Sequence, residues 1–237
     1  FRRVLFRSGK SLVTSLLAIQ TQRLGYHAAI LDADITGPSI PKIFGINKPA
    51  EAVDNSLLPH VTESGVKIMS MNMLLPNATD PVLWRGPVIS GVVKQFWEDV
   101  QWGDVDFLFV DMPPGTGDVP LTVFQSLPIN GILIVSTPQS LVSMIVDKAM
   151  NMAQMMQVPV LGMVENMRFL RCPDCGKEIP LFGSDDHVDN HAVPVLERIP
   201  LDPTVAAACD AGKLEQAEID YLAKTAVMLT ETFGKKQ

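Results

Sequence analysis

The chain has 237 residues, of which 47% are hydrophobic, and its formal net charge at pH 7 is −7. This composition predicts a globular protein with a sizeable core, organised as one large α/β domain or two small ones. The acidic balance argues against nucleic acid and anionic membranes as main partners, because both select clustered Lys and Arg. No apolar run approaches the ~18 residues that span a bilayer, and no signal-peptide pattern opens the sequence, so we expect a cytoplasmic protein.

Near the N-terminus, Ser8-Gly9-Lys10-Ser11 matches the end of the phosphate-binding pattern G-x-x-x-x-G-K-[ST]. In that loop the backbone N–H groups and the next helix hold phosphates, the Lys neutralises charge and the hydroxyl reaches Mg²⁺. The first glycine of the pattern is absent, because Val4 occupies its place. A Gly-Lys-Ser tripeptide also occurs by chance, so this stretch alone fits both a phosphate site and an ordinary helix start.

Further along the chain, apolar runs typical of buried strands alternate with segments of helical periodicity. This order predicts a doubly wound, mostly parallel sheet with right-handed crossovers, whose ligand site lies beyond the carboxyl ends of the strands. The predicted helices cover residues 11–24, 40–44, 88–100 and 140–157, and the predicted strands cover residues 28–31, 65–73, 106–111, 131–136 and 158–164.

Polar residues follow these predicted strands, at the edge where a ligand would bind. Asp32 and Asp34 follow the first run, Asp111 ends the third, and Asn166 follows the last. An apolar run that closes on Asp is the Walker B arrangement, in which the carboxylate holds Mg²⁺, although such an Asp can also simply cap a turn. Residues 112–118 are too rich in Pro and Gly for a helix and suit a loop that senses a γ-phosphate.

Several motifs together resemble the Mrp/ApbC family of iron–sulfur cluster carriers, within the MinD-like deviant-Walker ATPases. The resemblance covers nearly the whole chain and implies a P-loop NTPase fold of the MinD/SIMIBI type, with a first strand that is short or missing here. The motifs are Leu31-Asp32-Ala33-Asp34-Ile35-Thr36-Gly37-Pro38-Ser39-Ile40-Pro41, Trp84-Arg85-Gly86-Pro87, Asp111-Met112-Pro113-Pro114-Gly115-Thr116-Gly117-Asp118, Thr137-Pro138-Gln139, Glu165-Asn166-Met167, Cys172-Pro173-Asp174-Cys175-Gly176 and Ile199-Pro200-Leu201-Asp202-Pro203.

The resemblance implies a set of residues that bind phosphates and metal. Gly9, Lys10 and Ser11 would bind the ATP phosphates, and Ser11 and Asp111 would hold Mg²⁺. Asp111 would be the Walker B acid, and Asp32 would support the Mg²⁺ shell. The cofactors implied at this site are therefore ATP and Mg²⁺.

The resemblance also implies residues for catalysis and for recognition of the rest of the nucleotide. Asp34 would orient the attacking water, with Lys10 as the second catalytic residue. The backbone of Gly115 would sense the γ-phosphate, and Asn166 would contact the adenine base. These roles imply an ATPase.

The loop before Gly9 departs from the family pattern. The family loop resembles K-G-G-V-G-K-S, with a signature Lys that reaches the partner's ATP, whereas residues 5–11 here read L-F-R-S-G-K-S. Phe6 and Arg7 stand where glycines close the backbone on phosphate, so we expect weak or no ATP binding by this sequence. Residues 1–8 are interpreted as a non-native segment that replaces a truncated N-terminus. A degenerate relative that no longer binds ATP is the alternative.

Cys172 and Cys175 supply two thiolates, which is half of a four-ligand metal site. In the family the matching pairs from two subunits hold a [4Fe–4S] cluster, which implies a homodimer. His187 and His191 offer a rival, because the spacing approaches that of a zinc finger, although the gap is short. Simple structural thiols are the third possibility, and Cys209 lies on a predicted helix.

The resulting hypothesis is a single P-loop ATPase domain over residues 1–237, with residues 168–191 as the metal loop. It would dimerise, hydrolyse ATP and pass a [4Fe–4S] cluster to apo iron–sulfur proteins, with a cluster-assembly scaffold as a further partner. One alternative is a MinD-like positioning ATPase without a cluster, although residues 221–236 carry too few cations for a membrane-binding helix. A scaffold that binds Zn²⁺ and does not hydrolyse ATP is the other.

Overall fold

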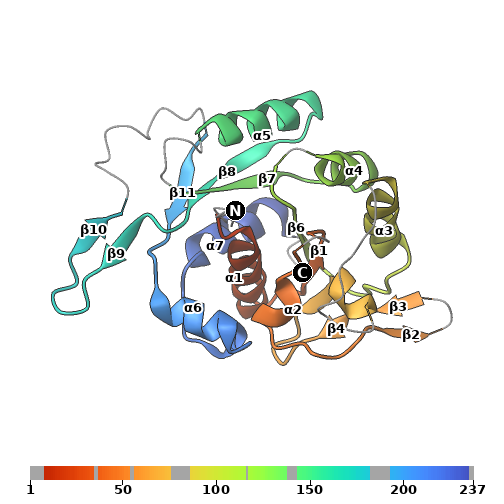
Figure 1. The fold of residues 1–237 in the computed structure, drawn as a ribbon, viewed down its shortest axis with the longest axis horizontal. Coiled ribbons are helices and arrows are strands. Elements are labelled where there is room, and N and C mark those ends of the chain that lie inside the picture. Colours follow the sequence, from red (N-terminus) through yellow and green to blue (C-terminus); the bar gives the residue numbers. More distant parts are fainter. Residues whose placement is uncertain are drawn as a thin grey trace, which may run out of the picture. The chain divides into compact units, whose positions relative to one another are not determined.

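The computed structural model describes residues 8–34, 37–53, 56–75, 86–115, 117–137, 143–181 and 193–234 (Figure 1). The chain divides into two compact units, a smaller one of Phe1–Lys10 with Ile129–Pro203 and a larger one of Ser11–Pro128 with Thr204–Gln237. The single domain over residues 1–237 therefore stays a prediction. The first strand, expected to be short or missing, would precede Ser8 and so lies outside the described residues, as do His187 and His191.

The larger unit is built on a four-stranded sheet in the order β4-β5-β1-β6. Strand β1 (Ala28–Asp32) is buried at every position, as expected of an apolar run in a parallel sheet. It pairs in parallel with β5 (Lys67–Ser70) and with β6 (Phe107–Asp111), whereas β4 (His60–Val61) is antiparallel. The register aligns Asp32 with Asp111, so both acids lie at the same edge of this sheet.

Helix α1 (Lys10–Arg23) follows the phosphate loop and packs by its apolar residues. Ala18 of this helix shares a core cluster with Ile30 of β1 and Ile68 of β5. Helices α3 and α4 of the larger unit lie side by side (Figure 1). The remaining elements of this unit are α2 (Ile40–Ile43), β2 (Glu51–Val53), β3 (Ser56–Leu58), the 3-10 turn η1 (Met71–Leu74), α3 (Gly86–Glu98), α4 (Asp118–Ser126), α6 (Pro203–Asp210), η4 (Leu214–Gln216) and α7 (Ala223–Phe233).

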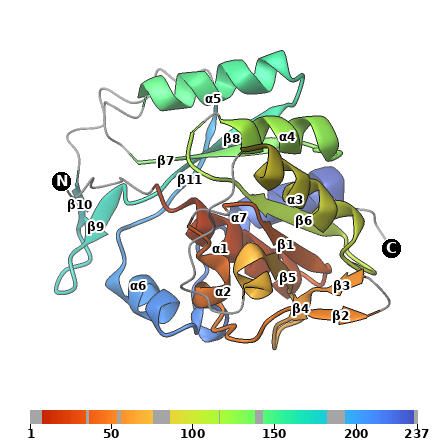
Figure 2. The same ribbon diagram turned by 45° about the vertical axis from the view of Figure 1, so that its right-hand side comes forward.

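The smaller unit has a three-stranded parallel sheet in the order β11-β8-β7. Its strands are β7 (Ile132–Ser136), β8 (Val160–Glu165) and β11 (Val195–Arg198), and α5 (Ser143–Met155) packs on them through Val146. An antiparallel hairpin of β9 (Phe169–Arg171) and β10 (Glu178–Pro180) projects from this sheet (Figure 2). The hairpin carries the Cys172–Cys175 turn at its tip.

The predicted alternation of strands and helices is confirmed, with boundaries that move by a few residues. The largest difference is at residues 65–73, where the predicted strand ends at Ser70 and Met71–Leu74 form a 3-10 turn. Met69, Met71 and Met73 are all buried, so the apolar pattern continues after the chain has left the sheet. Among the described residues, no helix is both long enough and apolar enough to span a bilayer.

Candidate functional site

The phosphate-loop residues lie against Asn166 within the smaller unit. Gly9 has a φ of +81°, and a Cβ at this position would collide with Nδ2 of Asn166. That nitrogen donates a hydrogen bond to the carbonyl oxygen of Ser8 at 3.0 Å, and Asn166 is buried. Glycine is therefore required at position 9 both by backbone conformation and by space.

Directly after this glycine, α1 begins at Lys10. The first turn of the helix contains no acidic residue that would neutralise the positive end of the helix dipole. Lys10 and Ser11 both lie in this first turn and are half-buried. A helix start of this kind, with a Lys beside it, suits a phosphate group.

Two buried carboxylates, Asp32 and Asp111, lie together at the strand ends of the larger unit. Oδ2 of Asp32 accepts a hydrogen bond from Ser70 Oγ at 2.9 Å, and its Oδ1 accepts one from the Asp34 amide at 3.2 Å. Thr14 Oγ1, on α1, donates to Oδ1 of Asp111 at 3.5 Å. Burial and the neighbouring charge of Asp111 raise the pKa of Asp32 well above its ordinary value.

This donor set fits Mg²⁺. The two carboxylates repel each other in a site shielded from water, and a divalent cation would relieve that repulsion. Within the described ranges, no three or more His, Cys, Asp or Glu side chains converge on one metal position, so these residues alone form no complete cage. Mg²⁺ binds in this way, through one or two carboxylates, water and substrate phosphates, and the Ser11 hydroxyl belongs to the same unit.

Asp34 and Gly115 lie in loops of the larger unit that follow β1 and β6. Oδ1 of Asp34 accepts a hydrogen bond from the Gly37 amide at 3.2 Å. Gly115 is exposed and has a φ of +93°, so its peptide group faces solvent in a conformation that other residues rarely adopt. Their roles in sensing and hydrolysis stay predictions.

The two cysteines lie on the turn between β9 and β10. The Cys172 amide donates to the Lys177 carbonyl and the Gly176 amide donates to the Cys172 carbonyl, each at 2.9 Å, so the turn is closed by its own backbone. Hydrogen bonds from the amides of Cys175 and Asp174 lower the pKa of Cys172. Cys172 is half-buried, Cys175 is exposed, and both thiols are free. The turn thus presents two free thiols that can serve as metal ligands.

The family model named ParA, described as NUBPL iron-transfer P-loop NTPase, matches residues 8–232. The chain belongs to this family. Among curated relatives, iron-sulfur cluster carrier proteins of Clostridium perfringens and Methanocaldococcus jannaschii are each 44% identical to it. The matches cover 88% of this chain and 77% of the Clostridium protein, and 86% of this chain and 72% of the Methanocaldococcus protein.

Solved structures agree with this family assignment. A nucleotide-binding protein of Archaeoglobus fulgidus in complex with ADP is 39% identical, with a TM-score of 0.80 over 92% of this chain and 86% of that chain. The septum site-determining protein MinD of Pyrococcus horikoshii, complexed with Mg-ADP, has a TM-score of 0.61 at 19% identity and covers 97% of this chain and 93% of that chain. The likeness to MinD concerns the fold alone. The predicted P-loop NTPase fold of the MinD type is confirmed.

Sequence patterns did not reveal every residue that supports the family's site. Thr14 and Ser70 contact the acidic pair from α1 and β5, and neither belongs to a recognised motif. Glu165 belongs to the Glu165-Asn166-Met167 motif, but the motif did not show that its side chain is buried and bonded to Arg198.

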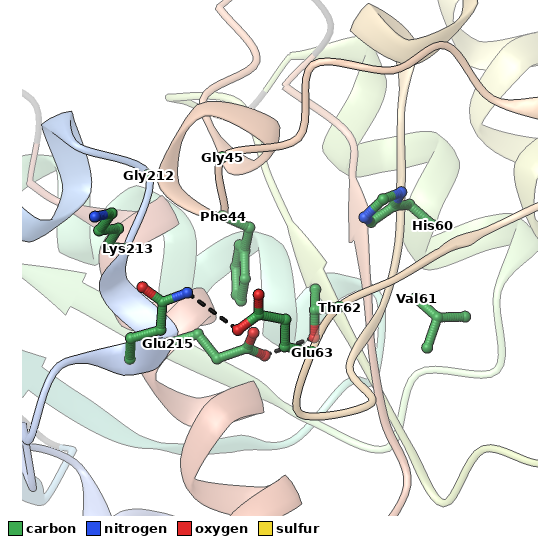
Figure 3. Close-up of a pocket in the computed structure, with 10 residues that line it drawn as sticks. Phe44, Gly45, His60, Val61, Thr62, Glu63, Gly212, Lys213 and Glu215 are labelled. Carbon is green, nitrogen blue, oxygen red and sulfur yellow. Dashed lines mark hydrogen bonds between the residues drawn. The ribbon is translucent and has the colours of Figure 1, made fainter.

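A cavity of about 220 Å³ also lies in the larger unit, away from these motifs in the sequence (Figure 3). Its acidic residues are already bonded within the cavity wall: Glu215 accepts from Thr62 Oγ1 at 2.5 Å, and Glu63 accepts from Gln216 Nε2 at 3.1 Å. Figure 3 shows these side chains turned toward one another, with His60 apart from them. The contacts tie η4 to the loop after β4, which is a structural role.

We expect Asp32→Asn to raise the melting temperature of the nucleotide-free protein at neutral pH. A carboxyl whose pKa is raised by folding binds its proton more tightly in the folded state, so stability falls as pH rises from about 4 through the raised pKa. The uncharged amide of Asn removes this pH-dependent loss of stability. The rise in melting temperature of the variant over the parent should be near zero at acidic pH and reach a plateau at higher pH. Each kcal/mol of stability regained should raise the melting temperature by roughly 2–4 °C.

Melting curves measured across this pH range, without nucleotide or Mg²⁺, test the expectation. Asp104→Asn is the matched control, because Asp104 is exposed and the same charge is lost there. Its melting temperature should stay close to that of the parent. A variant at Asp32 that melts below the parent at neutral pH would contradict the proposed repulsion between Asp32 and Asp111.

Proposed function

We propose that this chain is an ATP-dependent carrier that holds a [4Fe–4S] cluster between two copies of itself and transfers it to apo iron–sulfur proteins. The observation that carries the proposal is the turn at the tip of the β9–β10 hairpin, with two accessible free thiols in a preformed backbone loop. Membership of an iron-transfer P-loop NTPase family supports it, as do relatives named iron-sulfur cluster carrier protein.

The cluster is cargo in this proposal. One hairpin offers two thiolates and a [4Fe–4S] cluster takes four, so two chains related by a two-fold axis would complete the site. Exposure of Cys175 supports this, because a second copy and an acceptor protein can both reach it. Transfer is then an exchange of thiolate ligands, in which those of the acceptor replace Cys172 and Cys175.

The nucleotide would bind through the residues at the loop and the strand ends. Gly9 and Lys10 would hold the phosphates at the start of α1, and Asn166 would contact the adenine base. Ser11 and Asp111, supported by Asp32, would hold Mg²⁺, which neutralises phosphate charge when bound. The fit of the buried acids to a divalent cation and the open helix start support this assignment.

Hydrolysis and its coupling to the cargo would involve the loops after β1 and β6. Asp34 would orient the attacking water, and the peptide of Gly115 would respond to the γ-phosphate. The ordering of such loops by a γ-phosphate is a known way to shift a protein between two states. We place this carrier in the cytoplasm, with apo iron–sulfur proteins and a cluster-assembly scaffold as its partners.

Anaerobic reconstitution with iron and sulfide tests the function. We expect visible absorption from a thiolate-bound cluster, about four irons per dimer, a dimer by light scattering, and recovery of activity when an apo [4Fe–4S] enzyme is added. A colourless monomer with one tightly bound zinc per chain would contradict the proposal. That result would favour the zinc-binding alternative.

A further inference from the structure

A charged cluster in the smaller unit consists of the buried Glu165 and Arg168 and the more exposed Arg198, and is called the Glu165 cluster below. Oε2 of Glu165 accepts a hydrogen bond from Arg198 Nε at 2.9 Å and lies 3.7 Å from Arg168 Nε. The side chains of Glu165 and Arg168 are only 1% and 5% exposed, whereas that of Arg198 is 46% exposed. Burial of a carboxylate and a guanidinium is costly unless they stay paired, so these two side chains depend on each other for position.

On one side, the Glu165 cluster adjoins the contact with the phosphate loop. Glu165 is followed by Asn166, whose amide donates to the Ser136 carbonyl at 2.8 Å and whose side chain is bonded to the Ser8 carbonyl. The Glu165 carbonyl itself accepts from the Ile199 amide at 2.8 Å. A displacement of the loop at Gly9 must therefore move Asn166 or strain its contacts, and Glu165 is the next residue in the chain.

On the other side, the cluster holds the base of the cysteine hairpin. The Arg168 amide donates to the Ile199 carbonyl at 3.0 Å, and the Arg168 carbonyl accepts from the Leu181 amide at 3.4 Å. Phe169, the first residue of β9, accepts from the Leu201 amide at 2.8 Å. Because Leu181 directly follows β10, Arg168 joins both ends of the hairpin that carries Cys172 and Cys175.

The hydrogen bonding within the cluster is incomplete. Oε2 of Glu165 faces both arginines, while Oε1 of Glu165 is buried and has no hydrogen-bond partner among the residues that the structure describes. A buried carboxylate oxygen without a hydrogen bond is costly, so the bonding of this network is not at its best in the nucleotide-free chain. A network of this kind can respond to a ligand that binds beside it, because a small change in its bonding changes its free energy.

We propose that the Glu165 cluster couples nucleotide binding at Gly9 and Lys10 to the orientation of the Cys172–Cys175 turn. Nucleotide would thereby change how firmly the two thiolates hold the cluster. Glu165 and Arg168 act here as positioning residues and touch neither ligand. The inference rests on the proposed carrier function and adds the route by which one site regulates the other.

The test compares cluster release to an iron chelator with and without Mg-ATP, in the 237-residue chain with a restored phosphate loop. Glu165→Gln removes the charge and keeps the shape, and Glu178→Gln is the matched control. Glu178 also pairs with an arginine, Arg171, at 3.4 Å on the same hairpin, but both side chains are exposed. The restored loop carries Val4→Gly, Leu5→Lys, Phe6→Gly, Arg7→Gly and Ser8→Val.

In the parent and in Glu178→Gln, we expect Mg-ATP to change the release rate by about fivefold or more. In Glu165→Gln the two rates should become equal, while ATP affinity and cluster content each stay within about threefold of the parent. The ratio of rates isolates the coupling, because a general loss of stability would alter both rates together. Arg198→Gln should also bring the ratio of the two release rates closer to one. Because the Arg198 side chain is half-exposed, this variant is expected to fold more readily than Glu165→Gln.

Full nucleotide dependence in Glu165→Gln, or in Arg198→Gln if the first variant does not fold, would overturn the coupling role. A parent that holds the cluster but releases it at one rate with and without Mg-ATP would overturn it too, and would leave the carrier function standing. A parent that binds no cluster would instead overturn the proposed function itself. The two failures are therefore distinguishable.

Discussion

Cys172→Ser and Cys175→Ser are each expected to abolish cluster binding. A [4Fe–4S] cluster that spans two chains loses two of its four thiolate ligands in a homodimer of either variant, because each copy carries the change. Iron content after reconstitution should fall from about four per dimer to near zero, and the visible absorption should disappear. The dimer that depends on the cluster should dissociate, which light scattering would detect.

Cys209→Ser is the matched control for these variants. Cys209 lies on α6 in the larger unit, half-buried, and burial raises the pKa of its thiol, so it is poorly suited to serve as a ligand. Its replacement should leave iron content unchanged. Retention of the full iron content by Cys172→Ser would place the cluster elsewhere, and retention of zinc in place of iron by the parent would favour a different metal site.

Restoration of the phosphate loop is expected to raise ATP affinity by about a hundredfold or more, equivalent to about 2.7 kcal/mol. The chain carries Phe and Arg at positions 6 and 7, where glycines allow backbone N–H groups to surround phosphate. The restored loop supplies these glycines, and Leu5→Lys replaces the positive charge lost with Arg7→Gly. Isothermal titration with ATP and Mg²⁺ measures the gain directly.

Lys10→Ala in the restored loop serves as the control, since the loop keeps its glycines but loses the charge next to the helix start. Lys10→Ala should lower the ATP affinity of the restored loop to near that of the unchanged chain. Tight ATP binding by the chain as it stands, with Phe6 and Arg7 in place, would contradict the prediction. That outcome would mean that Gly9, Lys10 and the start of α1 suffice for phosphate binding.

The central strands were predictable from sequence because each is a buried parallel strand, and burial on both faces requires an uninterrupted apolar run. Strands β1 and β6 are of this kind. The β2 and β10 strands were not predicted, because both are three residues long and exposed at every position, so no pattern of burial marks them. Their pairing into hairpins depends on turns and neighbours.

The acidic part of the site followed from sequence for a simple physical reason. Residues that end adjacent parallel strands meet at one edge, and the register of Asp32 with Asp111 places both carboxylates there. The Glu165 cluster did not follow, because its members come from the end of β8, the chain three residues later and the end of β11. Only the folded structure shows that the Glu165 carboxylate contacts both arginines.

The close contact between Gly9 and Asn166 restricts how this protein can change over generations. Any side chain at position 9 meets the Asn166 amide, and it would also have to adopt a positive φ that side chains rarely take. A smaller residue at 166 removes the first obstacle but not the second, and it gives up the bond to the Ser8 carbonyl. Position 9 is therefore expected to stay glycine even where position 166 changes.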